Sequence, residues 1–108
     1  MRQDWPWRAT LYGVVIAELL FDDENEGKLA SHAISVEQAW QVLDNPYILE
    51  PNRRGRRADY LLIGRDDGGA CIALPAERTI DPMIWRPVTG WYCKRSELAR
   101  LNRRLQRR

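Results

Sequence analysis

The sequence predicts an α+β fold, a single small domain in which an antiparallel sheet packs with two N-terminal helices and a C-terminal helix. The chain has 108 residues, which leaves room for one compact domain over residues 1–108. Its composition, 44% hydrophobic and 30% charged, is typical of a globular domain with one core. The periodicity of apolar residues changes along the chain in the order strand, helix, helix, several strands and helix.

The N-terminal part is predicted to form a strand and a short helix. Residues 11–21 contain three consecutive β-branched or aliphatic residues, Val14 to Ile16, and favour a strand, although the same run also fits the start of a helix. Residues 25–32 are predicted to be helical because three acidic residues precede them. Negative charge there interacts favourably with the positive end of the helix dipole.

A second helix is predicted over residues 36–43. Ser35 and Gln38 have the spacing of a capping box. Apolar residues then recur at helical spacing, namely Val36, Ala39, Trp40 and Leu43. Pro46 ends the helix, and the apolar stripe is interpreted as core.

The second half of the chain holds most of the predicted sheet. Strands are expected at 47–49, 60–64, 70–74 and 85–89, and an amphipathic helix at 95–108. The turn 66–69 between the second and third of these strands gives the clearest hairpin signal. Residues 75–82 are expected to form a polar connection, and Pro87 to lie on a sheet edge or bulge.

Charge divides the chain into two unlike halves. Residues 1–50 carry three basic and nine acidic groups, a balance of −6, whereas residues 51–108 carry fourteen and six, a balance of +8. All of the 17 basic residues except Lys28 and Lys94 are arginines. Guanidinium groups bind phosphates and carboxylates in a bidentate manner, so the pattern indicates a nucleic acid or an acidic protein as partner. A GC-rich genome produces the same bias.

The cysteines and the N-terminal apolar run suggest a cytoplasmic protein. Cys71 and Cys93 lie 22 positions apart without a C-x-x-C unit, so we expect two reduced thiols and neither a zinc site nor a disulfide. The run 11–21 is short, contains Glu18 and precedes acidic residues, which argues against a signal peptide or membrane span.

Three short motifs follow one another along the chain. Residues 25–35 read N-E-G-K-L-A-S-H-A-I-S, residues 60–65 form a hydrophobic run that ends in I-G-R, and residues 86–91 read R-P-V-T-G-W, with Glu97 six positions further. This set resembles the BrnT family of toxins from type II toxin–antitoxin systems, whose fold is similar to that of RelE toxins. The corresponding family patterns are N-x-x-H/K-I/L-x-x-H-G-I/V-S/T, I-G-R/K, and R-I-I-S/T-A-R followed by Glu.

The resemblance spans about residues 21–104 and implies a small ribonuclease that needs no metal or other cofactor. It implies RNA, mRNA above all, as substrate, and an antitoxin protein as partner, in a homo-oligomer or a hetero-oligomer. The chain departs from the family pattern at three places. Ala33 replaces a glycine, Trp91 replaces the second arginine, and the connection 75–85 is enlarged.

By this resemblance Arg86 and Glu97 are candidate catalytic residues. Metal-independent RNA cleavage needs a proton acceptor, a proton donor and cations that stabilise the phosphorane. Arg86 would stabilise the transition state, or else form a structural ion pair with Glu97. Glu97 would act as general acid or base, or else supply favourable charge in the first turn of the last helix.

His32 and Lys28 complete the candidate catalytic set. His32 is the chain's one histidine. Imidazole side chains in general can transfer protons near neutral pH, so His32 is a candidate for that role. Alternatively it caps or orients the helix junction before Ser35. Lys28, one helical turn away, is a phosphate ligand or an ordinary solvated lysine.

The candidate nucleic-acid-binding residues are Arg53, Arg54, Arg56, Arg57, Arg65 and Trp91. The four loop arginines suit a phosphate backbone, or form a flexible solvated loop. Trp91, with Tyr92, could stack on bases, or belong to the core or its rim. We expect the basic loop and the last helix to lie on one face.

Three hypotheses follow. The chain is a toxin and metal-independent ribonuclease, a non-catalytic nucleic-acid-binding module on the same fold, or an interaction subunit that binds an acidic protein. The second hypothesis is motivated by Trp91 in place of an arginine. No glycine-rich loop indicates a nucleotide cofactor.

Overall fold

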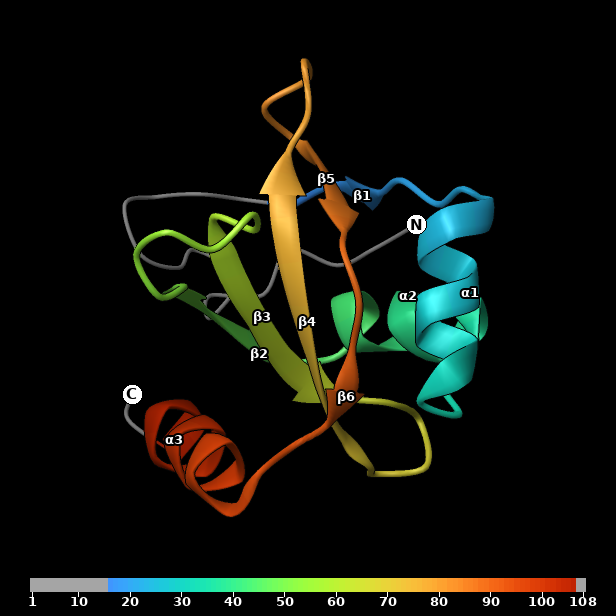
Figure 1. Ribbon diagram of the computed structural model, residues 1–108. Helices are drawn as coiled ribbons and strands as arrows, with labels where there is room; N and C mark the ends of the chain where they lie inside the picture. Colours follow the sequence, from blue (N-terminus) through green and yellow to red (C-terminus); the bar gives the residue numbers. More distant parts are fainter. Residues whose placement is uncertain (1–15, 107–108) are drawn as a thin grey trace.

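The computed structural model describes residues 16–106, which form an α+β domain with three helices and a six-stranded mixed sheet (Figure 1). The elements are β1 (Glu18–Leu19), α1 (Asp23–Ser31), α2 (Val36–Asp44), β2 (Tyr47–Pro51), β3 (Tyr60–Arg65), β4 (Cys71–Arg78), β5 (Ile84–Pro87), β6 (Trp91–Tyr92) and α3 (Arg95–Gln106). The predicted fold class is confirmed. Residues 11–15 of the predicted first strand and 107–108 of the predicted last helix lie outside the described residues.

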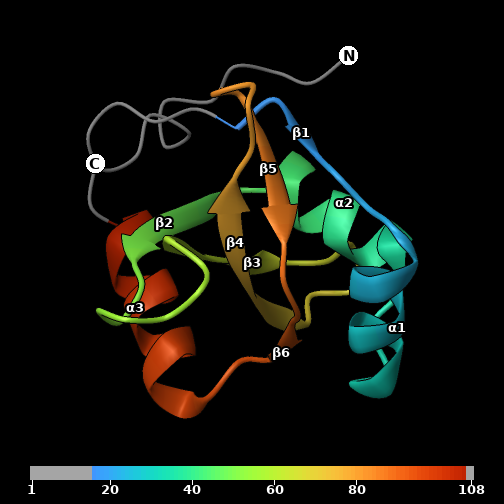
Figure 2. The same ribbon diagram turned by 45° about the horizontal axis from the view of Figure 1, so that its top comes forward.

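The sheet separates two cores because successive side chains of a strand point to opposite faces. Its strand order is β1-β5-β4-β3-β2. The short strand β6 pairs with the same edge of β4 as β5 does, but nearer the start of β4. On one face, Leu62 and Leu74 pack with Val42 of α2. On the other face, Ile63 packs with Leu101 of α3. Figure 2 shows α1 and α2 on one side of the sheet and α3 on the other.

Both N-terminal helices begin with a capping box. Asp22 and Asn25 exchange hydrogen bonds of 2.9 and 2.8 Å, so α1 starts two residues before the predicted boundary. Ser35 and Gln38 do the same at 2.9 and 3.1 Å, as the sequence predicts for α2. Asn25 is fully buried, and its side-chain amide also donates to the carbonyl oxygens of Leu20 and Pro87.

Helix α1 ends in a left-handed residue. The N–H of Ala33 donates to Ala30 O, and the N–H of Ile34 donates to Leu29 O, each at 2.9 Å. This pair of hydrogen bonds defines a Schellman motif, which requires a positive φ at the residue after the C-cap. Ala33 takes that place with φ 61°, a conformation that suits glycine better than alanine.

Two sheet predictions are corrected, and one short strand, β6, was not predicted. The sheet is mixed, because β1 pairs with β5 in parallel. Strand β4 continues through Pro75 to Arg78, into the predicted connection. Pro75 O accepts a hydrogen bond from Val88 N, a residue between β5 and β6. The N–H that proline lacks would point toward the same segment, where no strand pairs with β4, so its absence breaks no ladder hydrogen bond. β6, with two residues, is too short to produce a periodic signal.

The expectation of two reduced thiols is wrong in this structure. Cys71 and Cys93 form a disulfide with a Cα–Cα distance of 5.2 Å. The register of β4 and β6 places them opposite each other, and Cys93 N donates to Cys71 O at 2.9 Å. A spacing of 22 residues carries no disulfide signal by itself, since the pairing of the two strands creates the proximity.

Within residues 16–106, no helix combines the length and apolar composition that a membrane span requires.

Candidate nucleic-acid interface

A basic groove lies on the face of the sheet that carries α3. It has a volume of about 700 Å³ and is bounded by the β2–β3 loop (residues 52–59), the sheet and the start of α3. Its basic side chains are Arg53, Arg56, Arg57, Lys94 and Arg100. Its apolar lining includes Leu61, Pro75, Val88 and Trp91. The loop and the last helix therefore meet on one face, as their charge pattern led us to expect.

The β2–β3 loop is held in shape by Asn52. Its N–H donates to Asp59 O at 3.0 Å, and its side-chain amide donates to Ala58 O at 3.1 Å. The Asn52 side-chain oxygen accepts from Arg53 N at 2.8 Å. Gly55, with φ 84°, lets the chain reverse at the tip. The loop thereby holds three of its four arginines at the groove, while Arg54 does not line it.

Glu97 and Trp91 lie side by side in the groove lining. The Glu97 carboxylate is 5% exposed and accepts from Lys94 N at 2.7 Å, which caps α3. It also accepts from Trp91 Nε1 at 3.0 and 3.2 Å. Lys94 Nζ lies 5.8 Å from the centre of the indole ring, a cation–π distance. The carboxylate thus orients the tryptophan and the helix start together.

Glu50 is the second carboxylate in the groove lining. Its carboxylate accepts from Arg100 Nε at 3.1 and 3.0 Å and lies 3.7 Å from Arg104 Nη1. These contacts tie α3 to β2. The groove's two carboxylates, Glu50 and Glu97, are therefore both engaged within the protein, and its five basic side chains outnumber them.

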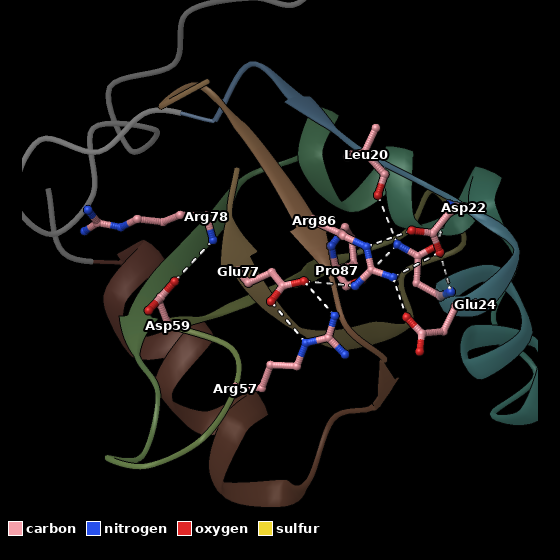
Figure 3. A network of polar contacts seen from close by, with 10 residues as sticks. Leu20, Asp22, Glu24, Arg57, Asp59, Glu77, Arg78, Arg86 and Pro87 are labelled. Carbon is pink, nitrogen blue, oxygen red and sulfur yellow. Dashed lines mark hydrogen bonds and ion pairs between the residues drawn. The ribbon is translucent and has the colours of Figure 1, made fainter. Parts of the chain in front are cut away.

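Arg86 lies outside the groove lining and is surrounded by carboxylates (Figure 3). Its Nε and Nη2 donate to the two oxygens of Asp22 at 2.8 and 3.0 Å. Nη2 also donates to Glu24 at 2.8 Å, and Nη1 to Glu77 at 3.0 Å. The structure gives Arg86 these partners in place of the predicted ion pair with Glu97.

This network fixes the charge of its members. Hydrogen bonds from Arg86 and from the backbone of Asn25 lower the pKa of Asp22 to about 2. Hydrogen bonds to Asp22, Glu24 and Glu77 raise the pKa of Arg86 despite its burial. Burial raises the pKa of Glu77, but hydrogen bonds from Arg57 and Arg86 outweigh it and the net shift is downward. Asp22, Glu77 and Arg86 therefore stay ionised at neutral pH.

The other predicted site residues lie away from the groove. Lys28 and His32 are exposed at the C-terminal end of α1, on the face of the sheet opposite α3. His32 is the C-cap residue of α1, which matches the alternative interpretation. Arg65 lies at the end of β3, and its guanidinium donates to Asn102 of α3. Of the four candidate catalytic residues, the groove contains Glu97 alone.

Two basic groove residues, Lys94 and Arg100, were missing from the predicted site. They lie three positions before and after Glu97, a helical spacing that places all three near one face of α3. That spacing was available in the sequence. However, the spacing indicates a binding site only when the position of the β2–β3 loop on the other side of the groove is known.

No family model, curated protein or solved structure matches this chain. Among residues 16–106, no three His, Cys, Asp or Glu side chains are grouped closely enough to hold a metal ion.

Proposed function

We propose that this protein binds single-stranded RNA in the groove. One observation carries the proposal: five basic side chains from two distant segments converge around an indole and an apolar floor. Proteins that bind single strands combine a positively charged groove for the phosphates with aromatic groups for the bases. Sequence-specific RNA recognition also targets unpaired bases far more often than duplex.

The charges of the groove support a phosphate ligand. The guanidiniums of Arg53 and Arg56 form no ion pair with a carboxylate among the described residues, whereas Arg57 is paired with Glu77. Three phosphate contacts would give binding a salt dependence with a slope of about −2 in log K against log salt.

Direct binding tests this proposal with a matched pair of variants. Affinity for a fluorescent single-stranded RNA oligomer is measured in EDTA over a range of salt. We expect Arg56→Gln to weaken binding about fivefold or more and to reduce the salt slope by about 0.7. Arg54→Gln, a change of equal charge in the same loop but outside the groove, is expected to have a much smaller effect. Equal losses in both variants would contradict a defined groove site.

A second candidate function is the ribonuclease toxin of the BrnT type, acting on mRNA and neutralised by an antitoxin. Two observations favour it. Ala33 adopts the left-handed conformation at the position where the family motif has glycine. The buried Glu97 also lies beside Lys94 and among the groove's cations. In metal-independent cleavage of RNA, a carboxylate can serve as the proton acceptor and a cation can stabilise the phosphorane.

Cleavage in EDTA separates this candidate from simple binding. A nuclease that uses Glu97 as proton acceptor loses its activity in Glu97→Gln while RNA binding persists. If neither the wild type nor Glu97→Gln cleaves RNA, binding remains the function that the groove supports. An acidic peptide that binds better than RNA would instead favour the interaction subunit.

A further inference from the structure

Arg57 is the one residue shared by the groove and the Arg86 network among the described residues (Figure 3). Its side chain lines the groove, and 53% of that side chain is exposed. Its Nε and Nη2 also donate to the two oxygens of Glu77, each at 3.1 Å. The guanidinium fork that could bind a phosphate is therefore already occupied by a carboxylate.

Glu77 has a second cationic partner. Its Oε2 accepts from Arg86 Nη1 at 3.0 Å as well as from Arg57 Nη2. Arg86 comes from β5, opposite Glu77 in the antiparallel register of β4 and β5, and is only 12% exposed. It cannot leave easily, because Asp22 and Glu24 also bind it. Glu77 thus has one fixed guanidinium and one exposed guanidinium.

The two ion pairs differ in how easily they break. Arg57 is exposed, and ion pairs of exposed arginines contribute little because water and salt compete with them. Arg86 is largely buried, and breaking its pairs would leave several charges without partners. If Arg57 turns away, Glu77 still keeps the hydrogen bond from Arg86, so this half-buried carboxylate is not left unpaired.

We propose that RNA enters the groove by an exchange of partners at Arg57. A phosphate takes the Arg57 guanidinium from Glu77, and Arg86 retains Glu77. This inference rests on the proposed RNA-binding function. Glu77 is then an internal competitor that lowers the affinity of the groove for anions, and Arg86 is a positioning residue that acts through Glu77 without touching RNA.

A specificity follows from this exchange. A ligand must displace a bidentate carboxylate from Arg57, so a weakly held monovalent anion competes poorly for it. A phosphodiester that simultaneously contacts Arg53, Arg56 or Lys94 gains enough from the other cations to complete the exchange. The groove therefore selects a chain of phosphates over a single small anion.

The test compares two variants that each remove one negative charge. Glu77→Gln removes the competitor, and Asp59→Asn removes a carboxylate that accepts from Arg78 N and does not line the groove. Figure 3 shows the Asp59–Arg78 contact separate from the chain that joins Arg57, Glu77 and Arg86. Binding of a fluorescent single-stranded RNA oligomer is measured for both variants at low salt, and again for each in an Arg57→Met background.

We expect Glu77→Gln to tighten RNA binding about three- to fivefold, because the contribution of an exposed ion pair that no longer has to be broken reaches about fivefold. Asp59→Asn is expected to change binding less than twofold. In the Arg57→Met background the effect of Glu77→Gln is expected to disappear, because no guanidinium remains to be released.

Each other outcome has a definite meaning. If Glu77→Gln weakens binding, Glu77 positions Arg57 for RNA and the competition is refuted. If Glu77→Gln and Asp59→Asn act equally, or if the gain persists without Arg57, general electrostatics explain the effect and the exchange is refuted. If the wild-type protein and all variants fail to bind RNA, the proposed function fails, and the exchange fails with it.

Discussion

Replacing Asn25 with alanine is expected to destabilise the protein by roughly 3–4 kcal/mol, because the side chain joins three segments inside the fold. Its amide donates to Leu20 O at 3.0 Å and to Pro87 O at 2.8 Å, and its oxygen accepts from Asp22 N at 2.8 Å. A buried carbonyl or N–H that loses its partner costs about 1–3 kcal/mol. Two carbonyls and one cap bond therefore account for the estimate.

Gln38→Ala is the matched control, since Gln38 has the same capping-box position in α2. Gln38 also bonds to Asp66 and Tyr92, but these contacts are at least partly exposed, so a loss of about 1 kcal/mol is expected. Urea unfolding followed by circular dichroism measures both variants. If Asn25→Ala costs no more than Gln38→Ala, the buried bond to Pro87 does not stabilise the fold and the reasoning is refuted.

Three further outcomes are expected. The Cys71→Ser/Cys93→Ser double variant is expected to lose about 3 kcal/mol, because the native disulfide closes a loop of sequence separation 22, and a thiol assay on unreduced wild type should detect neither cysteine as free. Ala33→Gly is expected to stabilise the protein by roughly 0.5–1 kcal/mol by removing the strain of φ 61°, whereas Ala30→Gly within α1 destabilises it; equal effects would contradict this account. Asp22 has a pKa lowered from 3.8 to about 2, so its stabilising contribution is present above about pH 4 and is lost as pH falls toward 2. In Arg86→Met that acid-dependent loss becomes smaller, and carbon NMR should find the Asp22 pKa nearer its ordinary value.

The order of elements could be predicted because helical and strand periodicities are local. The capping box at Ser35 and the amphipathic repeat that follows specify α2 without any tertiary information. Non-local features could not be predicted in the same way. Residues 75–82 were expected to form a connection, yet β4 continues through Pro75, whose missing N–H costs nothing where the neighbouring ladder is interrupted. The parallel pairing of β1 with β5 likewise joins residues that no local pattern connects.

For the candidate site too, local features could be predicted from the sequence and contacts between distant segments could not. Charge composition alone predicted a basic loop and a basic helix on one face, and both line the groove. Arg86 was expected to act on RNA because it matched a motif, but its partners Asp22 and Glu24 lie 64 and 62 positions away in sequence. Only the packing of α1 beside β5 brings these carboxylates to the arginine. A motif can thus identify a charged residue without identifying what neutralises it.

The most direct test of the account is the affinity of the purified protein for single-stranded RNA in EDTA, measured for wild type, Arg56→Gln and Arg54→Gln across a range of salt. The account predicts salt-dependent binding that Arg56→Gln weakens about fivefold or more and Arg54→Gln leaves nearly unchanged. Absence of binding at low salt, or equal losses in the two variants, would contradict the central claim that the groove is an RNA site.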